Sequence, residues 1–169
     1  MGYGNVVLMC GINDLKNDDV QSDQHIAEIY CSLRSKIKQI HKLSPKCNIF
    51  ICRVLPTKVM TLNQKVKSFN RLIYSDLLQT CPGVRVVDGF WKFADHKELL
   101  ADGLSKTFDR QGRPDLLHLN KYGVRILASL IKQSIFIRLH GGVDKRRHNG
   151  KNDGRLYSDA ARNPPTPRR

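Results

Sequence analysis

A carboxylate and an imidazole stand three residues apart in Asp115-Leu116-Leu117-His118, directly before Leu119-Asn120 and an expected helix. A carboxylate that bonds one imidazole nitrogen leaves the other nitrogen free to take a proton. Asp115 and His118 are therefore predicted to be the orienting group and the general base of a hydrolytic site. The alternative is structural: Asp115 or Asn120 begins the last helix and His118 faces solvent.

A second motif, Gly11-Ile12-Asn13-Asp14, follows an apolar run near the start of the chain. Gly11 allows a tight turn and leaves room for a substrate. The Asn13 amide can donate to a developing oxyanion without carrying charge, and Asp14 can bond nearby backbone N–H groups. The alternative is a plain turn after a strand.

The elements that position these motifs follow from hydrophobic periodicity. Three short apolar or β-rich runs are predicted to be strands: residues 6–10, 48–55 and 84–88. Three segments with apolar residues at three- and four-residue steps are predicted to be helices: residues 23–42, 62–77 and 120–139. This alternation predicts a parallel sheet flanked by helices. Ligands of such sheets bind at the carboxyl ends of the strands, and Gly11 and the Asp115/His118 pair would lie there. Residues 89–117 are expected to be rich in loops.

The composition of the 169 residues is that of an ordinary globular domain with a strong positive charge, +14. A basic surface attracts phosphates or acidic partners, although a solvated Lys-rich surface is the alternative. None of the five cysteines lies in a CxxC pair. Several lie on apolar runs, which favours buried free thiols, Cys10 among them, and a reducing compartment. The sequence contains neither a signal peptide nor an apolar stretch of about 18 residues, so an intracellular protein with no membrane span is expected.

The composition changes after His140, where Gly, Asn, Asp, Arg and Pro dominate. Residues 141–169 are therefore predicted to be a disordered basic tail, and residues 1–140 the folded domain. Lys145, Arg146 and Arg147 are candidates to bind nucleic-acid phosphates. The alternative for this tail is an ordinary solubilising terminus.

Taken together, the two motifs resemble those of the SGNH hydrolases, also called GDSL esterases or lipases. Gly11-Ile12-Asn13-Asp14 looks like that family's GxND block, and Asp115-Leu116-Leu117-His118 looks like its DxxH block. The segment 53–56 and the residues Asn63 and Asn70 have a similar look. The resemblance covers about residues 5–138. It implies an α/β protein with a flavodoxin-like three-layer α/β/α sandwich. It also implies hydrolysis of a small carboxyl ester or acetyl ester without a cofactor, with Asn13 as oxyanion donor, His118 as base and Asp115 as its partner.

The sequence departs from this family in one respect. The family's nucleophilic Ser lies in a Gly-Asp-Ser block that precedes the GxND block, and only ten residues precede Gly11. A first βαβ portion is therefore expected to be missing, and the chain to be inactive alone, with an exposed apolar edge along residues 6–10. Ser105 is the one Ser that its position does not exclude as a substitute.

Two further functions are alternatives to ester hydrolysis. One is a catalytically inactive, basic nucleic-acid-binding accessory module, because domains similar to this one occur in proteins of non-LTR retroelements beside RNA-handling parts. The other is a metal site at Asp115 and His118. It would need a third ligand, for which His96 is the only nearby candidate, and no metal is expected.

Overall fold

The computed structural model describes residues 4–16 and 23–139, and within them one parallel sheet of three strands. The strands are β1 (Asn5–Leu8), β2 (Asn48–Cys52) and β3 (Val84–Val87), in the order β1-β2-β3. The helices are α1 (Ile12–Leu15), α2 (Asp23–Leu43), α3 (Met60–Leu72), the π-helix η1 (Ile73–Leu77), α4 (Leu78–Thr80), α5 (Phe90–Phe93), the 3-10 helix η2 (Asp102–Leu104) and α6 (Lys121–Leu139).

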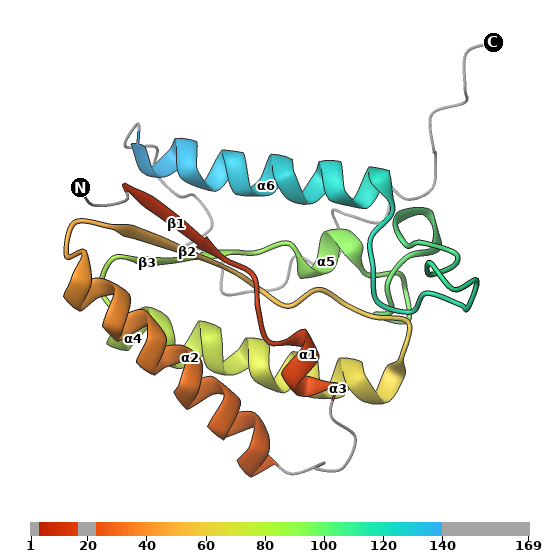
Figure 1. The fold of residues 1–169 in the computed structure, drawn as a ribbon, viewed down its shortest axis with the longest axis horizontal. Coiled ribbons are helices and arrows are strands. Elements are labelled where there is room, and N and C mark those ends of the chain that lie inside the picture. The colour runs from red at the N-terminus through yellow and green to blue at the C-terminus, as the bar shows by residue number, and fades with distance from the viewer. Residues whose placement is uncertain (1–3, 17–22, 140–169) are drawn as a thin grey trace.

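The sheet lies between two layers of helices, with α6 on one face and α2 and α3 on the other (Figure 1). The central strand β2 shows why, because successive side chains of a strand point to opposite faces. Ile49 and Ile51 pack among the buried residues of α2 and α3, whereas Phe50 and Cys52 pack against α6. The predicted α/β sandwich with a parallel sheet is confirmed. The predicted basic tail, residues 141–169, lies outside the described residues.

The second strand is shorter than its β-rich sequence predicts, and it ends at Cys52 instead of residue 55. The reason is the side chain of Asn70 on α3. Its Oδ1 accepts a hydrogen bond from the N–H of Val54 at 2.9 Å, and its Nδ2 donates to the carbonyl of Val54 at 2.8 Å. With both polar groups of Val54 bonded to one amide, the chain leaves the sheet and turns toward the next helix.

The strand β1 forms one edge of the described sheet. Its burial is incomplete: Val7 is 37% exposed, and Met9, just beyond the strand, is 64% exposed. Cys10 is exposed as well, so the expectation that it would be buried was wrong. A residue that follows a short edge strand has packed neighbours on fewer sides than one in the middle of a sheet, which explains the difference.

Gly11 has the backbone geometry that its motif requires. Its φ of 104° is in the left-handed region. A Cβ built at Gly11 would lie 2.9 Å from a ring atom of Phe69, which is fully buried on α3. Both the turn and the close packing against Phe69 therefore need a residue without a side chain.

We predict that Gly11→Ala lowers the free energy of unfolding by about 1–3 kcal/mol, because alanine is strained at this φ and its methyl group displaces Phe69. Urea unfolding at neutral pH measures the change. Gly103→Ala is the matched control, since nothing lies within 4 Å of a Cβ built there. Equal effects of the two substitutions would contradict the role given to Gly11.

Candidate active site

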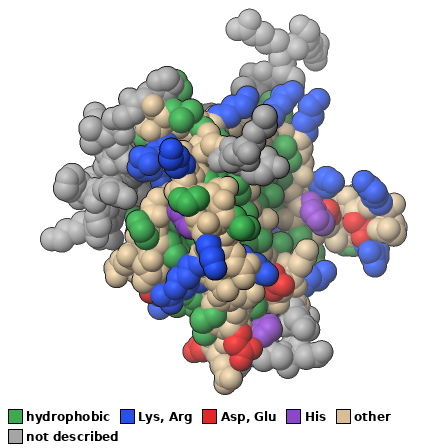
Figure 2. Space-filling view, turned by 60° about the vertical axis from the view of Figure 1, so that its left-hand side comes forward, with side chains coloured by type: hydrophobic (Ala, Val, Ile, Leu, Met, Phe, Trp, Pro, Cys, Tyr) green, Lys and Arg blue, Asp and Glu red, His purple; other side chains and the backbone are tan. Residues whose placement is uncertain are grey.

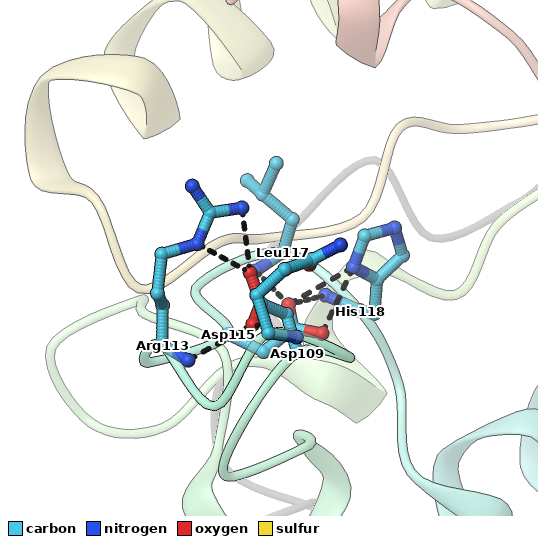
Figure 3. Close-up of polar contacts among 6 residues, drawn as sticks. Asp109, Arg113, Asp115, Leu117 and His118 are labelled. Carbon is cyan, nitrogen blue, oxygen red and sulfur yellow. Dashed lines mark hydrogen bonds and ion pairs between the residues drawn. The ribbon is translucent and has the colours of Figure 1, made fainter.

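The structure brings Asp115 and His118 into direct contact. Nδ1 of His118 lies 3.0 Å from each of the two carboxylate oxygens of Asp115. The Asp115 side chain is 5% exposed, and the His118 side chain is 70% exposed. Figure 3 shows the imidazole with Nδ1 toward Asp115 and its other ring nitrogen pointing away. A buried carboxylate thus fixes the orientation of an accessible imidazole.

Asp115 also shapes its own loop. Its Oδ1 accepts hydrogen bonds from the backbone N–H groups of Leu117, at 3.1 Å, and His118, at 2.9 Å. Burial by itself raises the pKa of the Asp115 carboxyl. The hydrogen bonds from the backbone N–H groups of His118 and Leu117 and from the imidazole outweigh that effect and hold the pKa below its usual value. Asp115 is therefore a charged acceptor at neutral pH.

The loop that carries the pair is fixed by backbone hydrogen bonds on several sides. The N–H of Lys106 donates to the carbonyl of His118 at 2.9 Å, and the N–H of Asp115 donates to the carbonyl of Thr107 at 3.1 Å. The N–H of Lys58, in the segment after β2, donates to the carbonyl of Leu116 at 2.9 Å. The segments that follow β2 and β3 are consequently joined at the site.

A tight turn before the pair adds to this support. Asp109 Oδ1 accepts hydrogen bonds from the N–H groups of Gln111 and Arg113, both at 2.9 Å. Asp109 Oδ2 accepts a further bond from Nε of Arg113 at 2.9 Å (Figure 3). The backbone hydrogen bond from Arg113 is the main reason that the pKa of Asp109 is held below its usual range. The turn thus joins two segments that pair through Phe108 and Pro114 and through Thr107 and Asp115, which positions the start of the Asp115 loop.

The structural alternative for this motif is correct in part. Asn120 begins α6, because its Oδ1 accepts hydrogen bonds from the N–H groups of Tyr122, at 2.9 Å, and Gly123, at 3.0 Å. This is the pattern of an N-cap residue. His118 faces solvent, as that alternative expected, yet it is held by Asp115. The turn, the cap and the oriented imidazole coexist in six residues.

The motif Gly11–Asp14 lies at the end of β1, where Ile12–Leu15 form the single turn α1. Gly11 is buried, and Asn13 and Asp14 are exposed. Within the part of the chain that the structure describes, neither the Asn13 nor the Asp14 side chain has a hydrogen-bond partner. The loop-shaping bond expected of Asp14 is thus not seen there. An unbonded Asn13 amide keeps its N–H groups available to a ligand, so its role as oxyanion donor stays a prediction.

Ser105 does not fit the role of a nucleophile. It is 5% exposed, and its hydroxyl donates to the carbonyl of Asp102 at 3.2 Å. Its backbone pairs with Leu119 in an isolated antiparallel bridge. The hydroxyl therefore serves the local structure of the loop and is shielded from solvent.

Sequence reasoning noted Asn63 and Asn70 only through the family resemblance and gave them no role. The amide of Asn63 bonds the N–H, the carbonyl and the hydroxyl of Thr57 at 2.7–3.0 Å, and it donates to the carbonyl of Glu98 at 2.9 Å. Glu98, which was missed entirely, has a φ of 60° and forms an ion pair with Lys67. The feature of the sequence that could have indicated a buried role for Asn63 and Asn70 is their position next to the apolar residues of the predicted helix 62–77.

Two further results concern ligands and membranes. Among the described residues, no group of three or more His, Cys, Asp or Glu side chains is placed to hold a metal ion. None of the described helices is both long enough and apolar enough to cross a membrane. Lys145, Arg146 and Arg147 lie outside the described residues, so nucleic-acid binding by the tail stays a prediction.

We predict that Asp115→Ala lowers the free energy of unfolding by about 1–3 kcal/mol at neutral pH, because two backbone N–H groups lose their acceptor. The folded-state pKa of Asp115 is lowered, so its stabilisation is complete above the ordinary carboxyl pKa of about 4 and is lost as the pH falls through the folded-state value. The difference between the two proteins should therefore shrink in acid, as urea unfolding over a pH series would measure. The exposed Asp14→Ala is the control, and a difference independent of pH would count against this role.

Comparison with known proteins supports the fold. No protein-family model matches the chain, and no curated protein sequence matches it. Among solved structures, the chain is similar to one described as a "putative platelet activating factor" from Streptococcus pneumonia, with a TM-score of 0.61 and 21% sequence identity. The match covers 78% of this chain and 59% of that chain. At this identity the similarity establishes a shared α/β fold. The present chain spans about three fifths of the neighbour's length.

Proposed function

We propose that this chain carries the general base and its orienting carboxylate from a Ser-type ester hydrolase site. The observation that carries the proposal is the buried Asp115 carboxylate, which holds Nδ1 of His118 while the other ring nitrogen points away from it. The pair lies in the segment after a strand of a parallel sheet, and folds of this class bind their ligands at the carboxyl ends of such strands. The α/β fold that the chain shares with its structural neighbour, at a TM-score of 0.61, is compatible with a site of this kind.

In this proposal the chain's own residues handle protons and negative charge. Nε2 of His118 takes the proton of an attacking hydroxyl and later gives it to the leaving alcohol. Asp115 keeps the imidazole in the Nδ1–H tautomer and stabilises the imidazolium that forms. The Asn13 amide donates to the oxyanion of the tetrahedral intermediate. The substrate class is a small carboxyl ester or acetyl ester.

The nucleophile is the missing part of the site. The family's Gly-Asp-Ser block does not occur before Gly11 in this sequence, and Ser105 is buried and bonded. Members of a catalytic triad act as a unit, so a base and an oxyanion donor alone give little acyl transfer. We therefore propose that the chain by itself turns over esters no faster than its exposed imidazoles do.

The orienting role of Asp115 has a spectroscopic test. We predict that neutral His118 is in the Nδ1–H tautomer and that Asp115→Asn removes this preference, because the hydrogen bond at one ring nitrogen decides which tautomer is present. Long-range proton–nitrogen NMR spectra at a pH where the imidazole is neutral report the tautomer. His96, which is exposed, is the internal control. An Nε2–H tautomer at His118 in the unsubstituted protein would remove the basis of the proposal.

Hydrolysis of p-nitrophenyl acetate tests the catalytic state. We predict non-saturating rates throughout, with His118→Ala and the matched control His96→Ala lowering the rate of the unsubstituted chain by the same small share, because each removes one exposed imidazole. A saturable rate that only His118→Ala abolishes would overturn the predicted inactivity and identify a nucleophile within the chain. In a longer chain that includes a Gly-Asp-Ser block, His118→Ala should lower kcat by at least about 1,000-fold. Full activity of that variant would refute the hydrolase proposal itself.

A further inference from the structure

The outward face of α6 carries three cations in one line. At about 100° per residue, Lys121, Arg125 and Lys132 lie within about 40° of one another around the helix axis. All three are exposed, and the buried residues Gly123, Leu127 and Leu130 occupy the opposite side of the helix. With a rise of 1.5 Å per residue, the three side chains are spread over about 17 Å, and the first two are about 6 Å apart.

Within the described residues, no interaction partner accounts for the positions of these cations. Lys121, Arg125 and Lys132 form no hydrogen bond or ion pair within the described residues, and α6 contains no Asp or Glu. Lys121 and Arg125 also lie toward the positive end of the helix dipole, which is an unfavourable place for a cation. Their presence therefore does not stabilise α6. Figure 2 shows Lys and Arg side chains at the top of the molecule, where α6 lies, and others lower in the view and at its right, where most of the Asp and Glu side chains lie.

Aromatic side chains accompany the cations on the same exposed side of the helix. Tyr122 and Phe136 are each 60% exposed, and both lie within about 100° of Lys121 around the helix axis. Exposed aromatic rings next to a line of cations are the combination by which proteins hold single-stranded nucleic acid: the rings stack on bases, and the cations follow the phosphates.

An anionic membrane surface fits the same helix less well. Helices that lie in a membrane interface insert a continuous apolar face into the lipid. The apolar face of α6 is already packed against the sheet through residues such as Leu127 and Leu130. Its exposed apolar side chains, Tyr122, Val124, Phe136 and Leu139, form groups that are separated along the helix by cations.

We propose that the outward face of α6, defined by Lys121, Tyr122, Arg125, Lys132 and Phe136, is a binding surface for single-stranded nucleic acid. The contacts go to phosphates and to the faces of bases, so the binding depends little on sequence and strongly on salt. This surface is independent of the proposed ester hydrolase chemistry, and it consists of described residues, unlike the predicted contacts of the tail.

The test uses the full chain and a fluorescently labelled, mixed-sequence DNA strand of about 20 nucleotides, with binding followed by fluorescence anisotropy at about 50 and 200 mM salt. We expect the triple variant Lys121→Gln, Arg125→Gln and Lys132→Gln to weaken binding by about tenfold or more at the lower salt concentration. The slope of log affinity against log salt should become shallower by about two units, because about three phosphate contacts are lost. Tyr122→Ala should weaken binding by about fivefold or more, because one stacked base is lost.

The matched control is the triple variant Lys36→Gln, Lys38→Gln and Lys42→Gln on α2, which removes the same charge from exposed positions in the other helical layer. We expect this variant to bind within about twofold of the unsubstituted chain. Equal losses in the two triple variants would mean that only the net charge matters, and would overturn the proposal. The proposal also fails if the α6 variant loses affinity for phosphatidylserine vesicles while the unsubstituted chain does not bind the oligonucleotide. His118→Ala should leave oligonucleotide binding unchanged, so the outcome does not depend on the hydrolase proposal.

Discussion

The segment between β3 and α6 has to satisfy its backbone polar groups with little regular secondary structure, and Asp115 is the residue on which that arrangement depends. One buried carboxylate accepts two backbone N–H groups of its own loop and the imidazole N–H of His118. A charged acceptor is stronger than a neutral one, and it is satisfied here by several donors at once. The local fold and the orientation of the imidazole therefore have the same physical cause.

The position of this loop depends in turn on the two buried amides of α3. The Asn70 side chain bonds the backbone N–H and carbonyl of Val54, so this residue does not pair in the sheet. The Asn63 side chain bonds the backbone of Thr57 and of Glu98. The neighbouring Lys58 then donates its N–H to the loop that carries Asp115 and His118. A change in α3 would thus be transmitted to the candidate site through hydrogen-bonded backbone. The amides also give the backbone N–H and carbonyl groups of Val54 and Thr57 partners outside regular secondary structure.

In the proposed function, His118 is a base that Asp115 orients for an attacking nucleophile. His118 is accessible, and its orienting carboxylate is shielded, which is the division of roles that acyl transfer requires. The exposed line of cations on α6 begins one residue after Asn120, the cap of that helix. The candidate hydrolytic site and the proposed nucleic-acid surface are therefore adjacent in the sequence, separated by Leu119 and Asn120. The two features are joined in the fold but rely on different residues.

The sequence alone determined the α/β class, the three strands, the long helices and the pairing of Asp115 with His118, because hydrophobic periodicity and short-range spacing are local properties. It also predicted the tight turn at Gly11, whereas the close packing of Gly11 against Phe69 came from the tertiary structure. The tertiary structure decided that β2 stops at Cys52, that Cys10 is exposed and that the Ser105 hydroxyl is engaged. It also revealed how Asn63 and Asn70 fix the loops. The Ser105 hydroxyl bonds the nearby carbonyl of Asp102. The end of β2, the exposure of Cys10 and the contacts of Asn63 and Asn70 depend on segments further away in the chain, and neither propensity nor periodicity carries information about such partners.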